Sequence, residues 1–178
     1  MNKTFRIVLI GILVSQALAL YTIESMIPVP FIAPGAKLGL ANLITVISLY
    51  ILESKRDVFL IIILRLLLST MFGGNLSTLM YGAAGAILSY YAMILVKTIG
   101  KDKISVIGVS ASGAFFHNLG QLIVGSIIVE NIGVMLYLPI LSMAGIGTGI
   151  FIGLTSNFIV RHISKLRYFD DIDNRHVT

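Results

Sequence analysis

The chain has 178 residues, of which 57% are hydrophobic and only 12% are charged, with a formal net charge of +5 and a mean hydropathy of +0.97. Soluble domains carry about 45–50% apolar and about 25% charged residues, so this composition excludes a water-soluble globule. The absence of cysteine from the sequence excludes disulfides, thiolate metal sites and thiol nucleophiles. The basic residues lie between long apolar runs rather than in one patch, so the positive charge does not indicate a nucleic-acid partner. The composition therefore predicts an integral membrane protein that lies in the lipid bilayer.

Six apolar runs are candidates for membrane-spanning helices, which need about 20 residues to cross a bilayer. They cover residues 5–23, 38–52, 58–72, 76–97, 104–129 and 134–163. The last run is too long for one straight span, and Pro139 with the glycines that follow it predicts a break before about Ser142. We expect an all-α protein with a single six-helix transmembrane domain over residues 1–167 and a polar cytoplasmic tail over residues 168–178.

The distribution of lysine and arginine predicts the orientation of the chain, because basic residues concentrate on the cytoplasmic side of membrane proteins. With six spans and a cytoplasmic start, eleven of the 13 basic residues fall on one side, only Lys37 falls on the other, and Arg65 lies inside a span. A five- or seven-span count would mix the two sides. We therefore expect both termini to be cytoplasmic. The eleven residues are Lys3, Arg6, Lys55, Arg56, Lys97, Lys101, Lys103, Arg161, Lys165, Arg167 and Arg175.

The outer connection over residues 24–37 is long and contains three prolines. Long loops in compact proteins often cover a binding site, and prolines stiffen the backbone. We interpret this segment either as a lid over such a site or as an extended connector.

Arg65 is the one basic residue inside an apolar run, roughly 10 Å from the cytoplasmic end at 1.5 Å per residue. No acidic residue falls within any of the six runs, so the sequence predicts no intramembrane carboxylate partner for it. Three interpretations remain open. The side chain extends to the inner headgroups, or bonds to neighbouring carbonyls and amides, or contacts a ligand.

Several polar side chains are expected at similar depth in the outer half of the membrane. His117 and Gln121 are four residues apart and therefore share one helical face. A lone polar residue in a span usually makes an interhelical hydrogen bond, but a group at one depth favours a binding cavity. We expect this cavity to hold a small-molecule ligand below the loop over residues 28–37. Its candidate binding residues are Gln16, Lys37, Asn42, His117, Asn118 and Gln121.

Small residues recur every four positions in two of the expected spans. They are Gly11, Ser15 and Ala19 in the first, and Gly145, Gly149 and Gly153 in the sixth. Such stripes let helices approach closely in lipid. The stripe of the first span is expected to face another helix, either within the fold or on a partner membrane protein.

The sequence offers no catalytic signal. It lacks a Gly-x-x-x-x-Gly-Lys loop, so any ATP must be hydrolysed by another subunit. A single histidine without paired carboxylates makes neither a hydrolase nor a metal site. The aspartates near the end, Asp170, Asp171 and Asp173, are interpreted as solvated tail residues. We expect a protein without catalytic residues, metal or cofactor.

Two segments carry a resemblance to a known family. Residues 32–42, Ile-Ala-Pro-Gly-Ala-Lys-Leu-Gly-Leu-Ala-Asn, and residues 113–121, Gly-Ala-Phe-Phe-His-Asn-Leu-Gly-Gln, resemble motifs of the Gx transporter family. Its members are commonly labelled heptaprenyl diphosphate synthase component I, and the family is similar to the vitamin-binding S components of energy-coupling factor (ECF) importers. The resemblance extends over roughly residues 5–165.

The resemblance implies an S-component-like bundle of six helices with an outer site closed by the loop between the first two spans. It also implies association with a transmembrane coupling subunit and two cytoplasmic ATPases. The ligand implied is flavin-like or related to isoprenoids. Two functions stay open: a non-enzymatic binding subunit of a transporter, and a membrane component that assists heptaprenyl or polyprenyl diphosphate synthesis for the menaquinone side chain.

Overall fold

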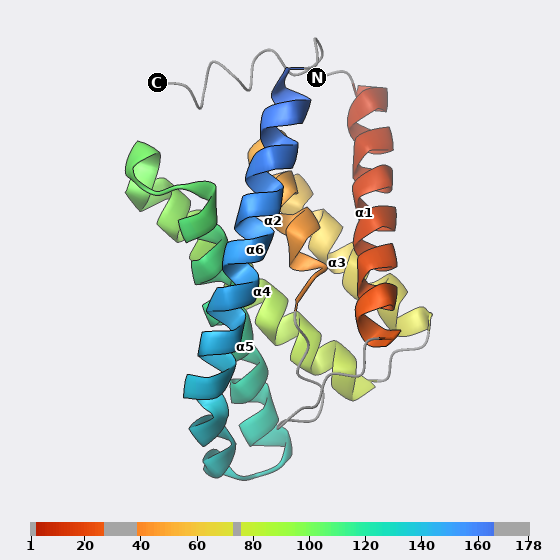
Figure 1. Ribbon diagram of the computed structural model, residues 1–178. Helices are drawn as coiled ribbons and strands as arrows, with labels where there is room; N and C mark the ends of the chain where they lie inside the picture. The colour runs from red at the N-terminus through yellow and green to blue at the C-terminus, as the bar shows by residue number, and fades with distance from the viewer. Residues whose placement is uncertain (1–2, 27–38, 73–75, 166–178) are drawn as a thin grey trace.

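The computed structural model describes residues 3–26, 39–72 and 76–165. In these ranges the protein is all-helical, with six α-helices and two short 3-10 segments (Figure 1). The α-helices are α1 (Lys3–Met26), α2 (Asn42–Ile51), α3 (Lys55–Met71), α4 (Leu76–Gly100), α5 (Val106–Ile128) and α6 (Leu138–Ser164). The 3-10 segments are Lys101–Lys103 and Ile132–Tyr137. Each of the six apolar runs thus contains one α-helix, as predicted.

The break expected early in the sixth run is also confirmed. A 3-10 segment ends at Tyr137 and α6 begins at Leu138, with Pro139 in its first turn. Proline is tolerated there because the first helical N–H groups have no intrahelical partner. The expected end of the first helix differs from the structure, since α1 continues to Met26, three residues beyond residue 23.

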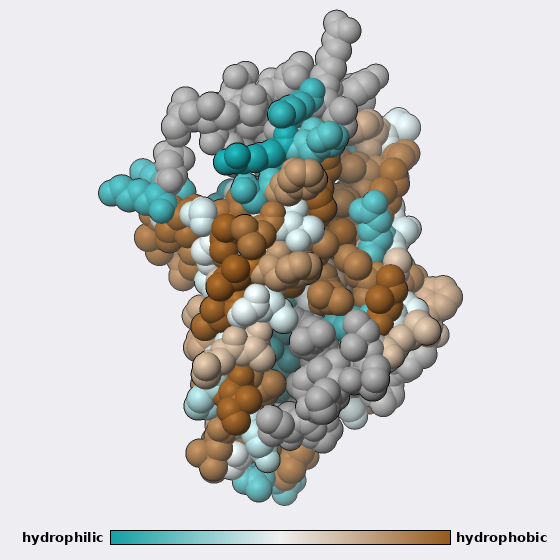
Figure 2. All heavy atoms as spheres, in the orientation of Figure 1, coloured by the Kyte–Doolittle hydropathy of each residue, from teal (hydrophilic) through white to brown (hydrophobic). Residues whose placement is uncertain are grey.

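Three segments of the described chain are long and apolar enough to cross a membrane: Lys3–Met26, Leu79–Gly100 and Ile132–Ile163. Large apolar side chains also cover much of the outer surface, including Met71, Ile132 and Leu136, each at least 80% exposed. Figure 2 shows apolar residues, in brown, over much of the visible face of the bundle. Extended exposed apolar surface of this kind fits contact with lipid. The protein is a multi-pass membrane protein.

The helices alternate in direction, so the start of α1 and the end of α6 lie at the same end of the bundle (Figure 1). Hydrophilic residues gather at that end in the space-filling view (Figure 2). At 1.5 Å per residue the ten residues of α2 rise only about 15 Å, half the thickness of a bilayer core. The start of α2 therefore lies deep in the bundle.

Helix α5 packs along both α4 and α6, while α1 packs on α3. Glycines on α6 allow its close contact with α5. A Cβ at Gly149 would lie 2.8 Å from Cα of Ala111, and one at Gly153 would lie 2.6 Å from Cα of Ile107. Only glycine permits such an approach to the α5 backbone. The predicted close packing of this small-residue stripe is confirmed.

The stripe of α1 behaves differently. Gly11, Ser15 and Ala19 are all exposed, and a Cβ at Gly11 would meet nothing within 4 Å. Helix α1 instead turns residues such as Leu13 and Ala17 to the core. Packing of the stripe within the described part of the fold is thereby excluded, and contact with a partner remains a proposal.

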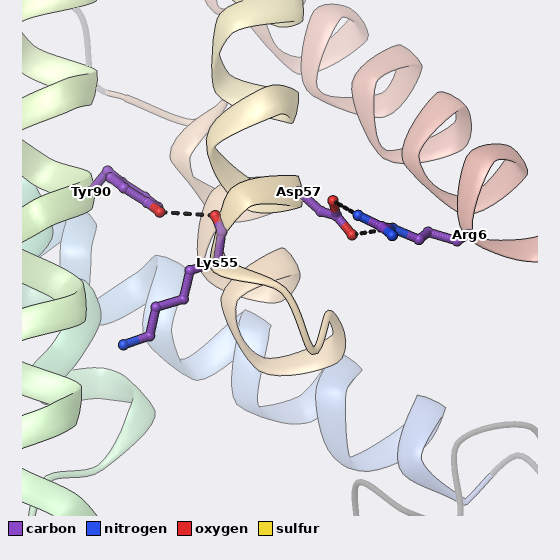
Figure 3. A network of polar contacts seen from close by, with 4 residues as sticks. All are labelled: Arg6, Lys55, Asp57 and Tyr90. Atoms are coloured by element: carbon purple, nitrogen blue, oxygen red, sulfur yellow. Dashed lines mark hydrogen bonds and ion pairs between the residues drawn. The ribbon is translucent and has the colours of Figure 1, made fainter. Parts of the chain in front are cut away.

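Two polar contacts tie the helices together at the end where α1 begins (Figure 3). Asp57 is buried in the first turn of α3 and accepts hydrogen bonds from Arg6 of α1, from Nε to Oδ2 at 2.6 Å and from Nη2 to Oδ1. The hydroxyl of Tyr90 on α4 donates to the carbonyl of Lys55 at 2.8 Å. These contacts join α1, α3 and α4, the helices that also supply most of the site described next.

Candidate functional site

A polar cavity of about 30 Å³ lies near the end of α1 and the start of α2, at the opposite end of α1 from Arg6. At about 10–15 Å³ per water, it has room for about two water molecules. It is enclosed by helices α1, α3, α4 and α5 and by Gly39 just before α2. Its described lining is Tyr21, Glu24, Gly39, Arg65, Leu66, Ser69, Thr70, Leu79, Gly82, His117 and Gln121.

Three polar atoms in this lining are buried without a hydrogen-bond partner among the described residues. They are Nε of Arg65, Nδ1 of His117 and Oε1 of Gln121, on side chains that are 6%, 6% and 7% exposed. Buried polar groups are nearly always hydrogen-bonded, and leaving one unpaired costs about 1–3 kcal/mol. Three such atoms around one small cavity indicate a place for a polar occupant.

The sequence places His117 here through helix periodicity and two glycines. His117 and Gln121 are one turn apart on α5 and face α4 together. A Cβ at Gly85 would lie 2.9 Å from the His117 ring, and a Cβ at Gly120 would lie 2.6 Å from the carbonyl oxygen of Ala84. The two glycines therefore let α4 and α5 approach closely enough to enclose the imidazole.

From the sequence we found no intramembrane carboxylate partner for Arg65 and missed an acidic residue that shares its cavity. Glu24 is only 4% exposed, lines the same cavity and attracts the guanidinium of Arg65. Its Oε1 accepts a hydrogen bond from the backbone N–H of Gly39 at 2.5 Å. The error arose because α1 continues to Met26 and carries Glu24 into the bundle, whereas the expected span ended at residue 23.

The burial of Arg65 excludes one of its three interpretations. A guanidinium that is 6% exposed and lines an internal cavity does not extend to the lipid headgroups. Because its Nε has no partner among the described residues, bonding to neighbours does not satisfy it fully. Bonding to neighbouring groups and contact with a ligand therefore both stay open as interpretations of this side chain.

A signal for Glu24 exists in the sequence. At 100° per residue, Glu24 lies on the same face of α1 as Leu13 and Ala17, the face that packs against the core. If the helix had been continued by one turn beyond the apolar run, the same periodicity would have placed the Glu24 carboxylate on the buried face of the helix.

The other candidate binding residues lie elsewhere. Asn118 donates from Nδ2 to the carbonyl of Leu141 on α6 at 2.6 Å, so it forms an interhelical contact. Asn42 is buried at the start of α2 but does not line the cavity, and Gln16 is exposed on α1. Lys37 and the loop over residues 28–37 lie outside the described residues. Of the five predicted binding residues that the structure describes, His117 and Gln121 are the two that it brings together at this cavity.

A larger cavity, of about 300 Å³, lies at the other end of the bundle, beside the α2–α3 turn and the end of α4. Lys97 lies in its wall, donates to the carbonyl of Leu49 at 2.8 Å and stacks over the ring of Tyr50 at 3.9 Å. None of the unpartnered buried atoms found in the described residues belongs to this wall. The smaller cavity is therefore the better candidate for a specific polar site.

The described lining of the two cavities does not supply the ligands of a metal centre. Within residues 3–26, 39–72 and 76–165, no three histidine, cysteine, aspartate or glutamate side chains come together. The polar cavity combines a cation, a carboxylate, an imidazole and an amide, which is a set suited to binding a small molecule through hydrogen bonds.

Comparison with known proteins gives one result. No curated protein and no solved structure matches the chain. A family model, described as heptaprenyl diphosphate synthase component I, matches residues 13–159, from near the middle of α1 to the last turns of α6. The match spans most of the chain and includes every described residue that lines the polar cavity. The chain belongs to the heptaprenyl diphosphate synthase component I family.

Proposed function

We propose that the protein is a substrate-binding membrane subunit, similar to the S components of ECF importers, which binds a small vitamin-like molecule. The observation that carries this proposal is the convergence of Arg65, His117 and Gln121 on one cavity with unpartnered buried atoms. A ligand that supplies those hydrogen bonds removes their desolvation cost and gains affinity from it.

The cavity is too small for a whole vitamin, since about 30 Å³ accommodates only a group the size of one or two waters. We infer that one polar edge of the ligand enters between α3 and α5. The remainder extends out of the cavity past Gly39, which lies in its lining.

Transport would require partners. The proposed partners are a transmembrane coupling subunit and cytoplasmic ATPases, and the exposed stripe of Gly11, Ser15 and Ala19 is the proposed contact on α1. Small residues allow a second helix to approach closely in lipid, where no hydrophobic driving force operates between helices.

The family description supports a second candidate function, a non-catalytic membrane component associated with heptaprenyl or polyprenyl diphosphate synthesis. Capture of the tagged protein from its native membrane distinguishes the two. The first function yields a coupling subunit, ATPases and a retained small molecule by mass spectrometry. The second yields a soluble prenyl synthase subunit instead, and that result would overturn the proposal.

Substituting Ser15→Leu is expected to lower the yield of captured coupling subunit several-fold, because it adds bulk at the centre of the small-residue stripe. The measurement is the ratio of coupling subunit to tagged protein. Ala144→Leu is the matched control, since it adds similar bulk at an exposed position of α6. Equal yields from the two variants would show that the α1 stripe only meets lipid.

We further propose that both termini lie in the cytoplasm, because the basic residues cluster at the end where α1 begins. Single cysteines at Ser54, in the α2–α3 turn, and at Glu130, after α5, lie at opposite ends of the bundle. In intact cells, a membrane-impermeant thiol reagent should label Glu130→Cys and spare Ser54→Cys. The chain has no native cysteine to interfere. The reverse labelling pattern would invert the orientation.

A further inference from the structure

Two opposite charges share the polar cavity. Arg65 and Glu24 are 6% and 4% exposed, and they are the two charged side chains in its described lining. Buried ions are strongly destabilising unless another charge or a set of hydrogen bonds compensates them. A second cation at His117 would be repelled by Arg65, so we assign the imidazole as neutral and the lining as carrying no net charge.

The atoms without partners define what a ligand must offer. Nε of Arg65 is a donor, Oε1 of Gln121 is an acceptor, and Nδ1 of His117 takes either role according to its tautomer. The carboxylate of Glu24 is already held by the N–H of Gly39. The complement to this set is a group with an acceptor next to a donor.

We propose that the part of the ligand held in this cavity is an uncharged, amide-like edge, such as a lactam, imide or ureide. Its carbonyl oxygen accepts from Nε of Arg65 and its N–H donates to Oε1 of Gln121. This inference rests on the proposed function and gives the chemical class of that subunit's ligand. Glu24 acts as the internal counter-ion that keeps the site neutral and selects against anions.

The charge balance argues against a phosphate or diphosphate group in this position. Such a group would place a second negative charge beside Glu24 in an interior of low dielectric, where like charges repel far more strongly than in water. The cavity therefore discriminates against the headgroup of a polyprenyl diphosphate.

The test removes the counter-ion and asks whether anion binding appears. Glu24→Gln keeps an acceptor for the N–H of Gly39 but leaves Arg65 with its charge uncompensated. Inorganic phosphate, at matched ionic strength, should then raise the thermal unfolding midpoint of the purified variant by about 3 °C at ten times its dissociation constant. Phosphate should leave wild-type protein unchanged. Glu130→Gln, the same charge change at an exposed site, should also show no shift.

The double variant Glu24→Gln with Arg65→Gln should lose the gain, because the cation that binds phosphate is gone. Glu24→Ala provides the same charge change should Glu24→Gln fail to fold, with bound radiolabelled phosphate as the measurement. Stabilisation of the wild type by phosphate, or no phosphate binding in a folded Glu24 variant, overturns the proposal.

A retained molecule in the wild-type preparation gives a second readout. Mass spectrometry should identify a compound with an uncharged amide-like edge, and a retained polyprenyl diphosphate would overturn the proposal. The phosphate experiment needs no coupling subunit. If the capture experiment finds no coupling subunit or ATPases but the Glu24→Gln variant still gains phosphate binding, the proposed function is rejected and this inference stands.

Discussion

Leucine in place of Gly149 is expected to lower the unfolding midpoint of the protein by about 5 °C or more. A Cβ at this position would lie 2.8 Å from Cα of Ala111 and 3.1 Å from the carbonyl oxygen of Ser110, so the clash is with the α5 backbone rather than with a side chain that can turn away. Overpacking of this kind costs about 1–3 kcal/mol or more, and each kcal/mol shifts the midpoint by about 2–4 °C in a chain of this size. The measurement is the fraction of monodisperse protein that remains after heating in detergent.

The chain supplies its own control on the same helix. Gly147 lies two residues away on the outer face of α6, where a Cβ would meet nothing within 4 Å. Gly147→Leu should unfold at the wild-type temperature or slightly above it, because it replaces a helical glycine with a better helix former. Equal losses at both positions would mean that α5 and α6 are not held together through the small-residue stripe.

The positions of the helices along the sequence were predictable because the surrounding medium is lipid rather than water. Backbone N–H and C=O groups in lipid must be bonded within the segment, so an apolar run of sufficient length has little choice but to form a helix. The break before α6 was predictable for a related reason, since Pro139 is accommodated only in a first turn.

The orientation of each helix about its own axis was harder to predict. In water the apolar face marks the core, but in a bilayer the lipid-facing side is apolar too. Gln16 and Glu24 illustrate the consequence, since Gln16 was predicted to line the binding cavity and Glu24 was assigned to the outer connection. Gln16 is exposed, whereas Glu24 is buried in the cavity.

The same difficulty separates His117 from Asn118. They are adjacent in sequence and at nearly equal depth, yet one residue turns the helix by 100°. His117 therefore faces α4 and the cavity, while Asn118 bonds to Leu141 on α6. The pairing of His117 with Gln121 was predictable because a four-residue spacing fixes a shared face whatever the orientation of the helix.

That separation gives the most direct test of the binding site. Ligand retention should fall in His117→Ala and Gln121→Ala, because each change removes a group that the ligand pairs with. The expected loss is roughly 1–3 kcal/mol, a factor of about 5–150 in dissociation constant. The measurement is the amount of the wild-type protein's co-purifying molecule retained per mole of variant. Nδ1 of His117 and Oε1 of Gln121 have no described hydrogen bond to lose, so a fall in the unfolding midpoint without ligand would measure the lost packing of the buried side chain.

Asn118→Ala should show the opposite behaviour. It removes the hydrogen bond to the carbonyl of Leu141, an interhelical contact worth about 1 kcal/mol in a membrane, and so should lower the unfolding midpoint by a few degrees. Ligand retention should change little, because its side chain points to α6 and away from the cavity. If Asn118→Ala loses the ligand while His117→Ala and Gln121→Ala retain it, the binding site lies at the α5–α6 interface instead. The unpartnered atoms of the cavity would then be hydrogen-bonded by water alone.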